Sequence, residues 1–326
     1  MRAGTQAGHF SRRRFVEFGA ASMLLPGMAW AQSVAPPQPG VPDDEAARVA
    51  AASDAARHMT IPVMIGDKGP FHFVVDTGAD RSVIADDVAV KLGLIRGHDV
   101  TVQGVVRSIS SRLVAVADLS FGGIRRRNLS MPILPRAFMG ADGYLGLDAV
   151  DGARVILDFD NRELLIGPPR TPSFYRLANP REALVPVRGS MGHLRSMNCR
   201  VQGVSTTCFI DTGAEISVGN SPLFQALLAD NPNYTILGML PITGITGGVI
   251  MGRVITVDTI RLHSVSFSHA VLAIADMQIF DVWGLSRQPS LLIGMNFLRQ
   301  FAKVSIDYGM KEIRFDLASM MLAQRA

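Results

Sequence analysis

FVVDTGAD, residues Phe73–Asp80, returns later in the chain as FIDTGAE, residues Phe209–Glu215. Each copy is an apolar run, typical of a buried strand, that ends in Asp-Thr-Gly and continues with alanine and an acid. A chain with two such copies can bring two aspartates, Asp76 and Asp211, face to face without a second chain. Paired carboxyl groups that share one proton can activate water against an amide bond. The first hypothesis is therefore hydrolysis of peptide bonds.

The sequence around the two copies also repeats. Each copy ends a predicted β-hairpin and is followed by a predicted helix. Each half then has a glycine after two apolar residues: Gly146 follows Asp76 by 70 positions, and Gly294 follows Asp211 by 83. The repeats indicate an all-β chain, mainly β with short helices, built from two copies of one unit. The predicted hairpin strands are 61–65 with 71–75 and 184–187 with 207–210, their turns are 67–69 and 202–203, and the predicted helices are 85–92 and 222–228.

Changes in composition suggest where the units begin and end. A Pro-rich segment, residues 33–42, has no core-forming residues, and the Ala-rich segment Asp43–Arg57 is compatible with a short helix. A second proline-containing stretch, Gly167–Pro180, separates the two units. The expected segments are a signal peptide at 1–31, a linker and short helix at 32–58, a first lobe at 59–168, a linker at 169–183, a second lobe at 184–318 and a C-terminal tail at 319–326.

The N-terminus has the pattern of an export signal. Ser11–Val16 contains a twin arginine followed by two bulky apolar residues, and an apolar stretch then runs from Phe18 to Trp30. Ala29–Ala31 offers the small residues that a signal peptidase reads. This resembles a twin-arginine (Tat) signal cleaved after Ala31. A membrane anchor is the alternative, but the apolar stretch is shorter than the roughly 20 residues that cross a bilayer. We therefore expect a periplasmic protein that does not span the membrane after cleavage.

Charge and metal-ligating residues argue against two other function classes. The chain has a formal net charge of +4, of which residues 1–31 supply +3, so the body carries +1. The basic cluster of the body, Arg125–Arg127, lies beside a predicted turn at Gly122–Gly123 and is interpreted as a solvated face. No nucleic-acid partner is expected, because such a partner needs several cations on one surface. The 7 histidines are scattered, so no metal or other cofactor is expected.

The two cysteines, Cys199 and Cys208, flank the turn predicted at 202–203. They lie on one face of the predicted hairpin but diagonally, and diagonal neighbours are farther apart than a disulfide prefers. A disulfide in an oxidising compartment and two buried thiols are both compatible with this pattern.

Each half resembles a lobe of the retropepsin-type aspartic proteases, because both landmarks of that family occur twice. These landmarks are Asp-Thr-Gly-Ala followed by an acid, and the downstream glycine after two apolar residues. The resemblance covers most of residues 59–316 and implies two lobes related by a pseudo-two-fold axis, with the active site between them. It implies Asp76 and Asp211 as the catalytic pair. It also implies that Thr77, Gly78, Thr212 and Gly213 support the pair, and that Ala79, Asp80, Ala214 and Glu215 contact the substrate.

A protease of this type also needs a cover over its cleft. Thr243–Val249 has three glycines between apolar neighbours, which suits a flap hairpin in close backbone contact with a peptide. An ordinary hairpin turn is the alternative. The counterpart in the first half, Val102–Val106, has one glycine, so the two flaps are expected to differ. The flap residues expected to contact substrate are Gly104, Gly244, Gly247 and Gly248.

One pair of positions departs from the family pattern. Viral retropepsins place an arginine directly after the downstream glycine, where it pairs with the acid that follows Asp-Thr-Gly-Ala. Those positions are Leu147 and Met295 in this chain. Asp80 and Glu215 are therefore expected to lack that arginine, which makes their contact with substrate less secure.

Taken together, the sequence favours an aspartic endopeptidase that acts on a peptide or protein substrate. It is expected to be a monomer whose two lobes form an intramolecular pseudo-dimer. A non-catalytic peptide-binding or scaffolding protein with the same fold is the alternative. A third arrangement would pair each lobe with the same lobe of another chain, and the two unlike flaps argue against it.

Overall fold

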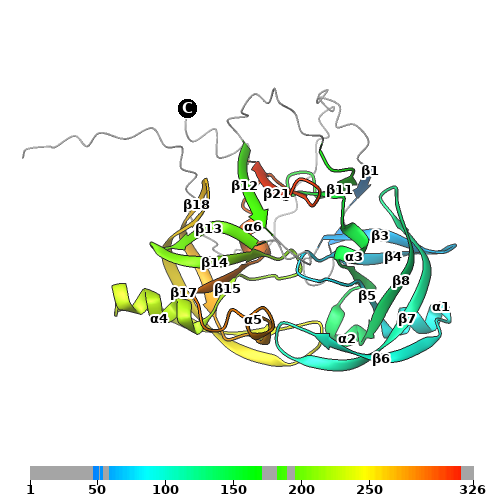
Figure 1. Cartoon of the computed structure of the whole chain (residues 1–326), viewed down its shortest axis with the longest axis horizontal. Helices are drawn as coiled ribbons and strands as arrows, with labels where there is room; N and C mark the ends of the chain where they lie inside the picture. Colours follow the sequence, from blue (N-terminus) through cyan, green and yellow to red (C-terminus); the bar gives the residue numbers. More distant parts are fainter. Residues whose placement is uncertain (1–46, 51, 54–58, 171–181, 189–194, 317–326) are drawn as a thin grey trace, which may run out of the picture.

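The computed structural model describes residues 47–50, 52–53, 59–170, 182–188 and 195–316. The expected signal peptide, the Pro-rich segment 33–42 and the expected tail at 319–326 lie outside these residues. The described chain forms two β lobes that lie side by side, joined by a sheet to which both contribute (Figure 1). This is the all-β, two-lobed architecture predicted from the repeats.

The first lobe is built on an 8-stranded sheet, ordered β2-β3-β4-β9-β5-β8-β7-β6. Its elements are β2 (Ala52–Ser53), β3 (Met59–Ile65), β4 (Lys68–Val75), β5 (Val83–Ala85), α1 (Asp86–Leu92), β6 (Arg96–Gln103), β7 (Ser108–Phe121), β8 (Ile124–Leu134), α2 (Arg136–Met139), β9 (Gly143–Leu145) and α3 (Leu147–Val150).

The second lobe repeats this order of elements within a larger sheet. Its elements are β13 (Arg195–Val201), β14 (Val204–Ile210), β15 (Val218–Gly219), α4 (Ser221–Asp230), β16 (Ile236–Thr243), β17 (Val249–Leu262), β18 (Val265–Ile274), α5 (Gln278–Val282), β19 (Ser290–Ile293) and α6 (Met295–Leu298). The predicted helices at 85–92 and 222–228 are confirmed as α1 and α4. Asn220 caps the start of α4 by accepting a hydrogen bond from the Leu223 N–H (3.1 Å).

The joining sheet has the order β1-β11-β10-β20-β21-β12. The lobes meet where β10 pairs with β20, in antiparallel register from Arg154 opposite Asp307 to Asp158 opposite Lys303. The order reads alike from either side of this pair, so the pseudo-two-fold axis passes between β10 and β20. These strands are β1 (Ala47–Ala50), β10 (Arg154–Asp158), β11 (Glu163–Gly167), β12 (Glu182–Arg188), β20 (Lys303–Asp307) and β21 (Glu312–Asp316).

Two expectations about strands and helices were wrong. The Ala-rich segment Asp43–Arg57 contributes strands β1 and β2 where it is described, not a helix. Its neighbours β11 and β3 present edges whose backbone groups it pairs with, and such tertiary pairing overrides the weak helix propensity of a short segment. In the second lobe, the hairpin partner of β14 is β13, whereas residues 184–187 belong to β12, the counterpart of β1 in the joining sheet.

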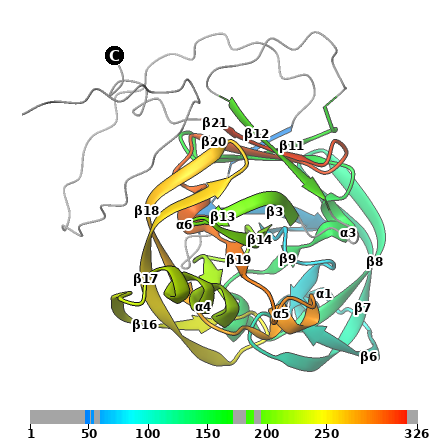
Figure 2. The ribbon, with the colours of Figure 1, turned by 60° about the vertical axis from the view of Figure 1, so that its left-hand side comes forward.

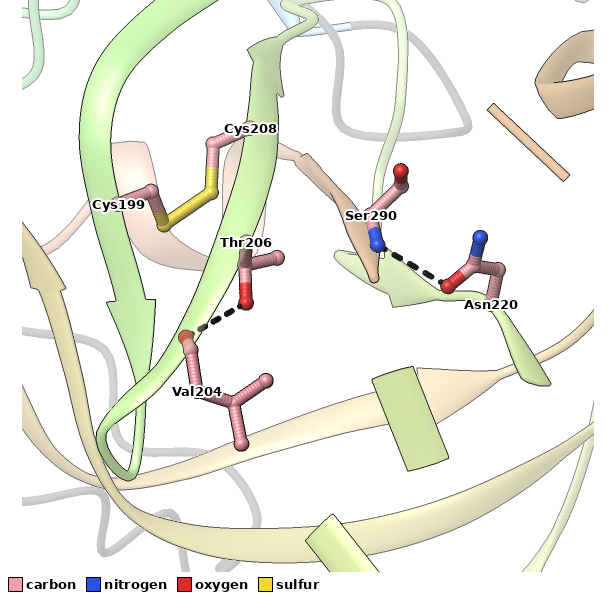
Figure 3. Close-up of a disulfide and its surroundings, with 6 residues drawn as sticks. All are labelled: Cys199, Val204, Thr206, Cys208, Asn220 and Ser290. Atoms are coloured by element: carbon pink, nitrogen blue, oxygen red, sulfur yellow. Dashed lines mark hydrogen bonds between the residues drawn. A yellow bond between two sulfur atoms is a disulfide. The ribbon is translucent and has the colours of Figure 1, made fainter. Parts of the chain in front are cut away.

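Cys199 and Cys208 form a disulfide between β13 and β14, with their Cα atoms 6.1 Å apart (Figure 3). The register is diagonal as predicted, because Cys199 faces Thr206 and Cys208 faces Ser196. However, the register shifts between Ser196 and Cys199, and this irregularity brings the two Cα atoms within the range that a disulfide spans. Of the two possibilities that the sequence left open, the structure has the disulfide.

Candidate active site

Parallel pairing places each Asp-Thr-Gly loop beside the glycine that follows in the same lobe. Strand β4 runs parallel to β9, and β14 runs parallel to β19, so the loop and the downstream glycine leave neighbouring strands at the same end. The N–H of Asp76 donates to the Leu145 carbonyl (2.9 Å), and that of Asp211 to the Ile293 carbonyl (3.0 Å). The two sequence landmarks therefore form one structural unit in each lobe.

The downstream glycines are required by close backbone packing. A Cβ on Gly146 would lie 2.6 Å from the Arg81 carbonyl carbon, and one on Gly294 would lie 2.7 Å from the Ala214 oxygen. Both distances are shorter than any contact a real side chain makes, so only glycine fits. The next residue, Leu147 or Met295, then donates its N–H to the carbonyl of Ala79 (2.9 Å) or Ala214 (2.8 Å).

The two aspartates meet at the junction of the lobes. A Cβ on Gly78 would lie 2.7 Å from Cγ of Asp211, and a Cβ on Gly213 would lie 2.7 Å from Cγ of Asp76. Each glycine therefore packs directly against the carboxyl group of the opposite lobe, where no side chain could be accommodated. Within each loop, the glycine N–H also donates to its own aspartate at 2.8 Å. Both aspartates are buried, so the two carboxyl groups share one small, largely dry space.

Two threonines cross between the loops and fix this geometry. The Thr77 hydroxyl donates to the Ile210 carbonyl (3.0 Å) and accepts the Thr212 N–H (3.0 Å). The Thr212 hydroxyl donates to the Val75 carbonyl (2.7 Å) and accepts the Thr77 N–H (3.1 Å). Both side chains are buried, so each lobe satisfies backbone groups of the other.

The environment of Asp76 favours its neutral form. Burial raises the pKa of Asp76 well above its ordinary value, the neighbouring charge of Asp211 raises it further, and so does a hydrogen bond between the two carboxyl groups. The N–H groups of Gly78 and Ala79 oppose this shift but do not cancel it. This balance favours one proton shared between the two carboxyl groups, which titrate as a pair.

A further pair of side chains braces each loop, and sequence reasoning missed it. In the first lobe, Asp148 Oδ1 accepts both the N–H (2.8 Å) and the hydroxyl (2.6 Å) of Ser82. In the second lobe, Asn296 Oδ1 accepts the same two groups of Ser217, at 2.9 and 2.7 Å. The only signal in the sequence is positional, because both serines follow their aspartate by the same interval and both partners follow the downstream glycine by the same interval.

The acids after Asp-Thr-Gly-Ala differ between the lobes. Asp80 and Glu215 are both exposed at the edge of the site. The expectation that Glu215 lacks an arginine was wrong, because Arg299, just beyond α6, binds it through Nη1 (2.6 Å) and Nη2 (3.2 Å). The turn of α6 brings an arginine from four residues beyond Met295 to the carboxylate. At the corresponding position in the first lobe stands Asp151.

The comparisons with known proteins agree with this geometry. The family model described as aspartyl protease matches residues 61–149 and residues 197–297, once in each lobe. The chain belongs to the aspartyl protease family. Each match contains one Asp-Thr-Gly loop with its downstream glycine, so the resemblance to two tandem retropepsin-like lobes is confirmed. No curated protein matches the chain.

In this member of the aspartyl protease family, both expected flaps are hairpins whose tips meet. Figure 2 shows β6–β7 and β16–β17 converging on the side of the molecule opposite β20 and β21. At the junction the Thr246 hydroxyl donates to the Arg107 carbonyl (2.7 Å), and Arg107 Nε donates to the Thr246 carbonyl (3.0 Å). Thr246 is buried against Gly104, where an added Cβ would collide with its hydroxyl. The flap glycines predicted to contact substrate therefore also pack the flaps against each other, with Gly244 against Val105 and Gly247 and Gly248 against Arg107.

Each flap also contacts a helix of the opposite lobe, by different chemistry. The first flap is hydrogen-bonded to α5, because the Ile279 N–H donates to the Val105 carbonyl (3.4 Å) and Gln278 Nε2 donates to the Ser108 hydroxyl (2.8 Å). The second flap meets α2 through an apolar contact, because the Phe138 ring would lie 2.9 Å from a Cβ on Gly247. The two hairpins therefore differ in their contacts with the opposite lobe, and their role as flaps over a substrate stays a prediction.

Among the described residues, no group of three or more His, Cys, Asp or Glu side chains is placed to hold a metal ion. The described part of the chain also contains no helix that is long and apolar enough to cross a membrane. Trp283 stacks on Phe209, two residues before Asp211, with ring centroids 4.6 Å apart.

Proposed function

We propose that the chain is an aspartic endopeptidase in which Asp76 and Asp211 together activate a water molecule. The observation that carries this proposal is the reciprocal packing at the lobe junction, where each loop glycine lies against the carboxyl group of the other lobe. This packing leaves two buried carboxyl groups with room for one proton between them. A side-by-side pair of this kind can act as base and acid in the same step.

In the proposed reaction, the ionised carboxylate takes a proton from the attacking water while the protonated carboxyl donates its proton to the carbonyl oxygen of the scissile bond. The product of this step is a gem-diol, with no covalent bond to the protein. When the gem-diol collapses, the C–N bond breaks, the protonated carboxyl gives its proton to the leaving nitrogen, and the other carboxylate takes a proton from a gem-diol hydroxyl. The pair again shares one proton, and the products are a carboxylic acid and an amine. No cofactor is needed for any of these steps.

The surrounding residues support this chemistry in separable ways. The crossed hydrogen bonds of Thr77 and Thr212 hold the carboxyl groups at a fixed separation. Ala79 and Ala214 follow the loops and are partly exposed, which supports a floor of small side chains beneath an extended peptide. The flaps would have to part at Arg107 and Thr246 to admit the peptide and would then close over it, which excludes water from the site.

The proposal also covers the oligomeric state of the protein and its location in the cell. The intrachain pairing of β10 with β20 supports a monomer in which one chain supplies both aspartates. The twin-arginine pattern at the N-terminus supports a periplasmic location. Light scattering of the active species and cell fractionation test these two statements, and active material found only as dimers, or only in the cytoplasm, would contradict them.

The test of the function is peptide cleavage by the purified protein and its Asp76→Asn and Asp211→Asn variants, assayed against a mixed peptide library across acidic to neutral pH. We expect each variant to lose cleavage by about 100-fold or more, the scale of lost acid–base catalysis. Asp67→Asn, in the exposed turn between β3 and β4, is the matched control and should cleave normally. Undiminished cleavage by Asp76→Asn or by Asp211→Asn would refute the proposal. A wild-type protein that retains peptides without cleaving them would instead indicate a non-catalytic binding protein.

A further inference from the structure

The pair of side chains that braces each aspartate loop, Ser82 with Asp148 and Ser217 with Asn296, is here called the brace. The two braces make the same hydrogen bonds, but the partner of the serine differs in chemistry. In each lobe a serine hydroxyl accepts the N–H of the downstream glycine: Gly146 donates to Ser82 Oγ (3.0 Å), and Gly294 donates to Ser217 Oγ (2.9 Å). Each serine then donates its own N–H and hydroxyl to one oxygen of a side chain two positions beyond that glycine. That side chain is a carboxyl group, Asp148, in the first lobe and an amide, that of Asn296, in the second.

The brace of the first lobe is connected through the backbone to Asp76, which forms the catalytic dyad proposed here together with Asp211. The Leu145 carbonyl, which accepts the Asp76 N–H, belongs to the residue before Gly146, and Ser82 follows Asp76 on the same loop. The Ser82–Asp148 contact therefore ties the loop that carries Asp76 to the strand end that holds its backbone. A change at Asp148 would reach Asp76 through this connection, without any contact between Asp148 and a reacting atom.

The amide in the second lobe gives an uncharged version of the same contact. Asn296 uses Oδ1 to accept both serine groups and uses Nδ2 to donate to the Val271 carbonyl (3.4 Å). An aspartate reproduces this pattern of acceptor and donor only when it is protonated on its second oxygen. When ionised, it has no proton to donate and places a charge in a largely buried space.

The surroundings of Asp148 favour the neutral form. Burial, the largest effect, raises the pKa of Asp148, while the Ser82 groups, the charge of Arg81 and the Ala149 N–H lower it without reversing the direction. Arg126 of β8 donates to the backbone carbonyls of Ala149 and Asp151, within and just beyond α3. Charged residues near Asp148 include Arg81 and Asp80 on the loop, Asp151 at the end of α3, and Arg126 on β8.

We propose that Asp148 is a titrating positioning residue: protonated, it braces the Asp76 loop as Asn296 braces the Asp211 loop, and on ionisation it loosens the first lobe and disturbs the dyad. Because the second lobe carries an amide at this place, only one half of the active site is sensitive to pH in this way. The part of the proposal that concerns the dyad rests on the proposed peptidase function. The titration itself does not.

The reciprocal exchange of the two side chains tests the proposal. The thermal unfolding midpoint of the wild type, Asp148→Asn and Asn296→Asp is measured from about pH 4 to pH 8, together with the pH profile of kcat on a cleaved peptide. Asp148→Asn should match the wild type at the acidic end and exceed it at pH 8, by about 2–4 °C for each unit by which folding raises the pKa. The unfolding midpoint of Asn296→Asp should fall as the pH rises over the same range. A variant that folds at pH 4 but not at pH 8 would support the proposal equally.

The exposed Asp151→Asn is the control for loss of a charge near α3 and should follow the wild-type profile. A stability difference between Asp148→Asn and the wild type that stays constant with pH would overturn the titration. If Asp148→Asn reduces the loss of stability with rising pH yet leaves the alkaline side of the kcat profile where it was, the link to Asp76 and Asp211 is refuted. Absence of cleavage in every variant would count against the peptidase proposal, and the unfolding data would still decide whether Asp148 titrates.

Discussion

Replacing Thr77 by valine removes one hydroxyl from the junction of the lobes and almost nothing else. Valine has nearly the shape of threonine, and Thr77 is buried, so no cavity and no new exposed surface result. The lost hydroxyl leaves two buried backbone groups without their partner, namely the Thr212 N–H and the Ile210 carbonyl. Each unsatisfied buried group costs about 1–3 kcal/mol, so the expected loss of stability is about 2–6 kcal/mol.

Urea unfolding followed by circular dichroism measures this loss. If the free energy of unfolding falls by about 3 kcal/mol per molar of urea, the urea concentration at the unfolding midpoint should fall by roughly 0.7–2 M. Thr77→Ser is the matched control: it keeps the hydroxyl and loses one methyl group, for a smaller cost of about 1 kcal/mol. Thr212→Val should behave like Thr77→Val, because its hydroxyl serves the Thr77 N–H and the Val75 carbonyl in the same way.

The same variant separates stability from catalysis. Loss of the crossed hydrogen bonds should let the two loops shift relative to each other. The kcat of Thr77→Val should therefore fall even in the absence of urea, where the protein is still folded. A midpoint within about 0.2 M of the wild type, or a Thr77→Ser variant as damaged as Thr77→Val, would refute the reasoning that these hydroxyls join the lobes.

Three further outcomes are expected. Replacing both Cys199 and Cys208 by alanine should lower the free energy of unfolding, measured in urea, by about 3 kcal/mol, because their disulfide closes a loop with a sequence separation of 9. A reductant should have no further effect on this variant, and an unchanged urea midpoint would contradict the prediction. Gly104→Ala should lower kcat/KM by about 10- to 100-fold, because the added methyl collides with Thr246 in the closed flaps, whereas Gly238→Ala, with open space around it, should not. Because the pKa of Asp76 is raised from 3.8, the stability contributed by its protonated form should be fully present below that pH and be lost as the pH rises through the folded value. Asp76→Asn should therefore reduce the fall of the unfolding midpoint with rising pH; a curve parallel to that of the wild type would count against the shared proton.

The sequence predicted those parts of the site whose chemistry is local. Asp-Thr-Gly is readable in the sequence, because the loop needs a carboxyl group, a crossing hydroxyl and a residue without Cβ against the opposite carboxyl group. The downstream glycine is equally constrained by the backbone it packs on. Such requirements leave a readable tripeptide or single residue in the chain, and their repetition predicted both the lobes and their pairing.

What the sequence did not predict depends on contacts that the fold creates. Ser82 and Asp148 are 66 positions apart, and the pairing of β9 with both β4 and β5 brings them together. Arg299 reaches Glu215 because of how α6 turns, which no spacing rule conveys. The strand β1 is extended because an open sheet edge lies beside it, although its alanines have the opposite intrinsic preference.

The pairing of β10 with β20 bears on how such a molecule can diversify. In an assembly of two identical chains, every substitution enters the cleft twice, and a change that helps one side must be tolerated on the other. Because both halves of this molecule belong to one chain, that restriction is lifted, and each half can accumulate changes of its own. The aspartate and the asparagine behind the two loops, and a flap with one glycine facing a flap with three, are differences that an exact two-fold axis would forbid.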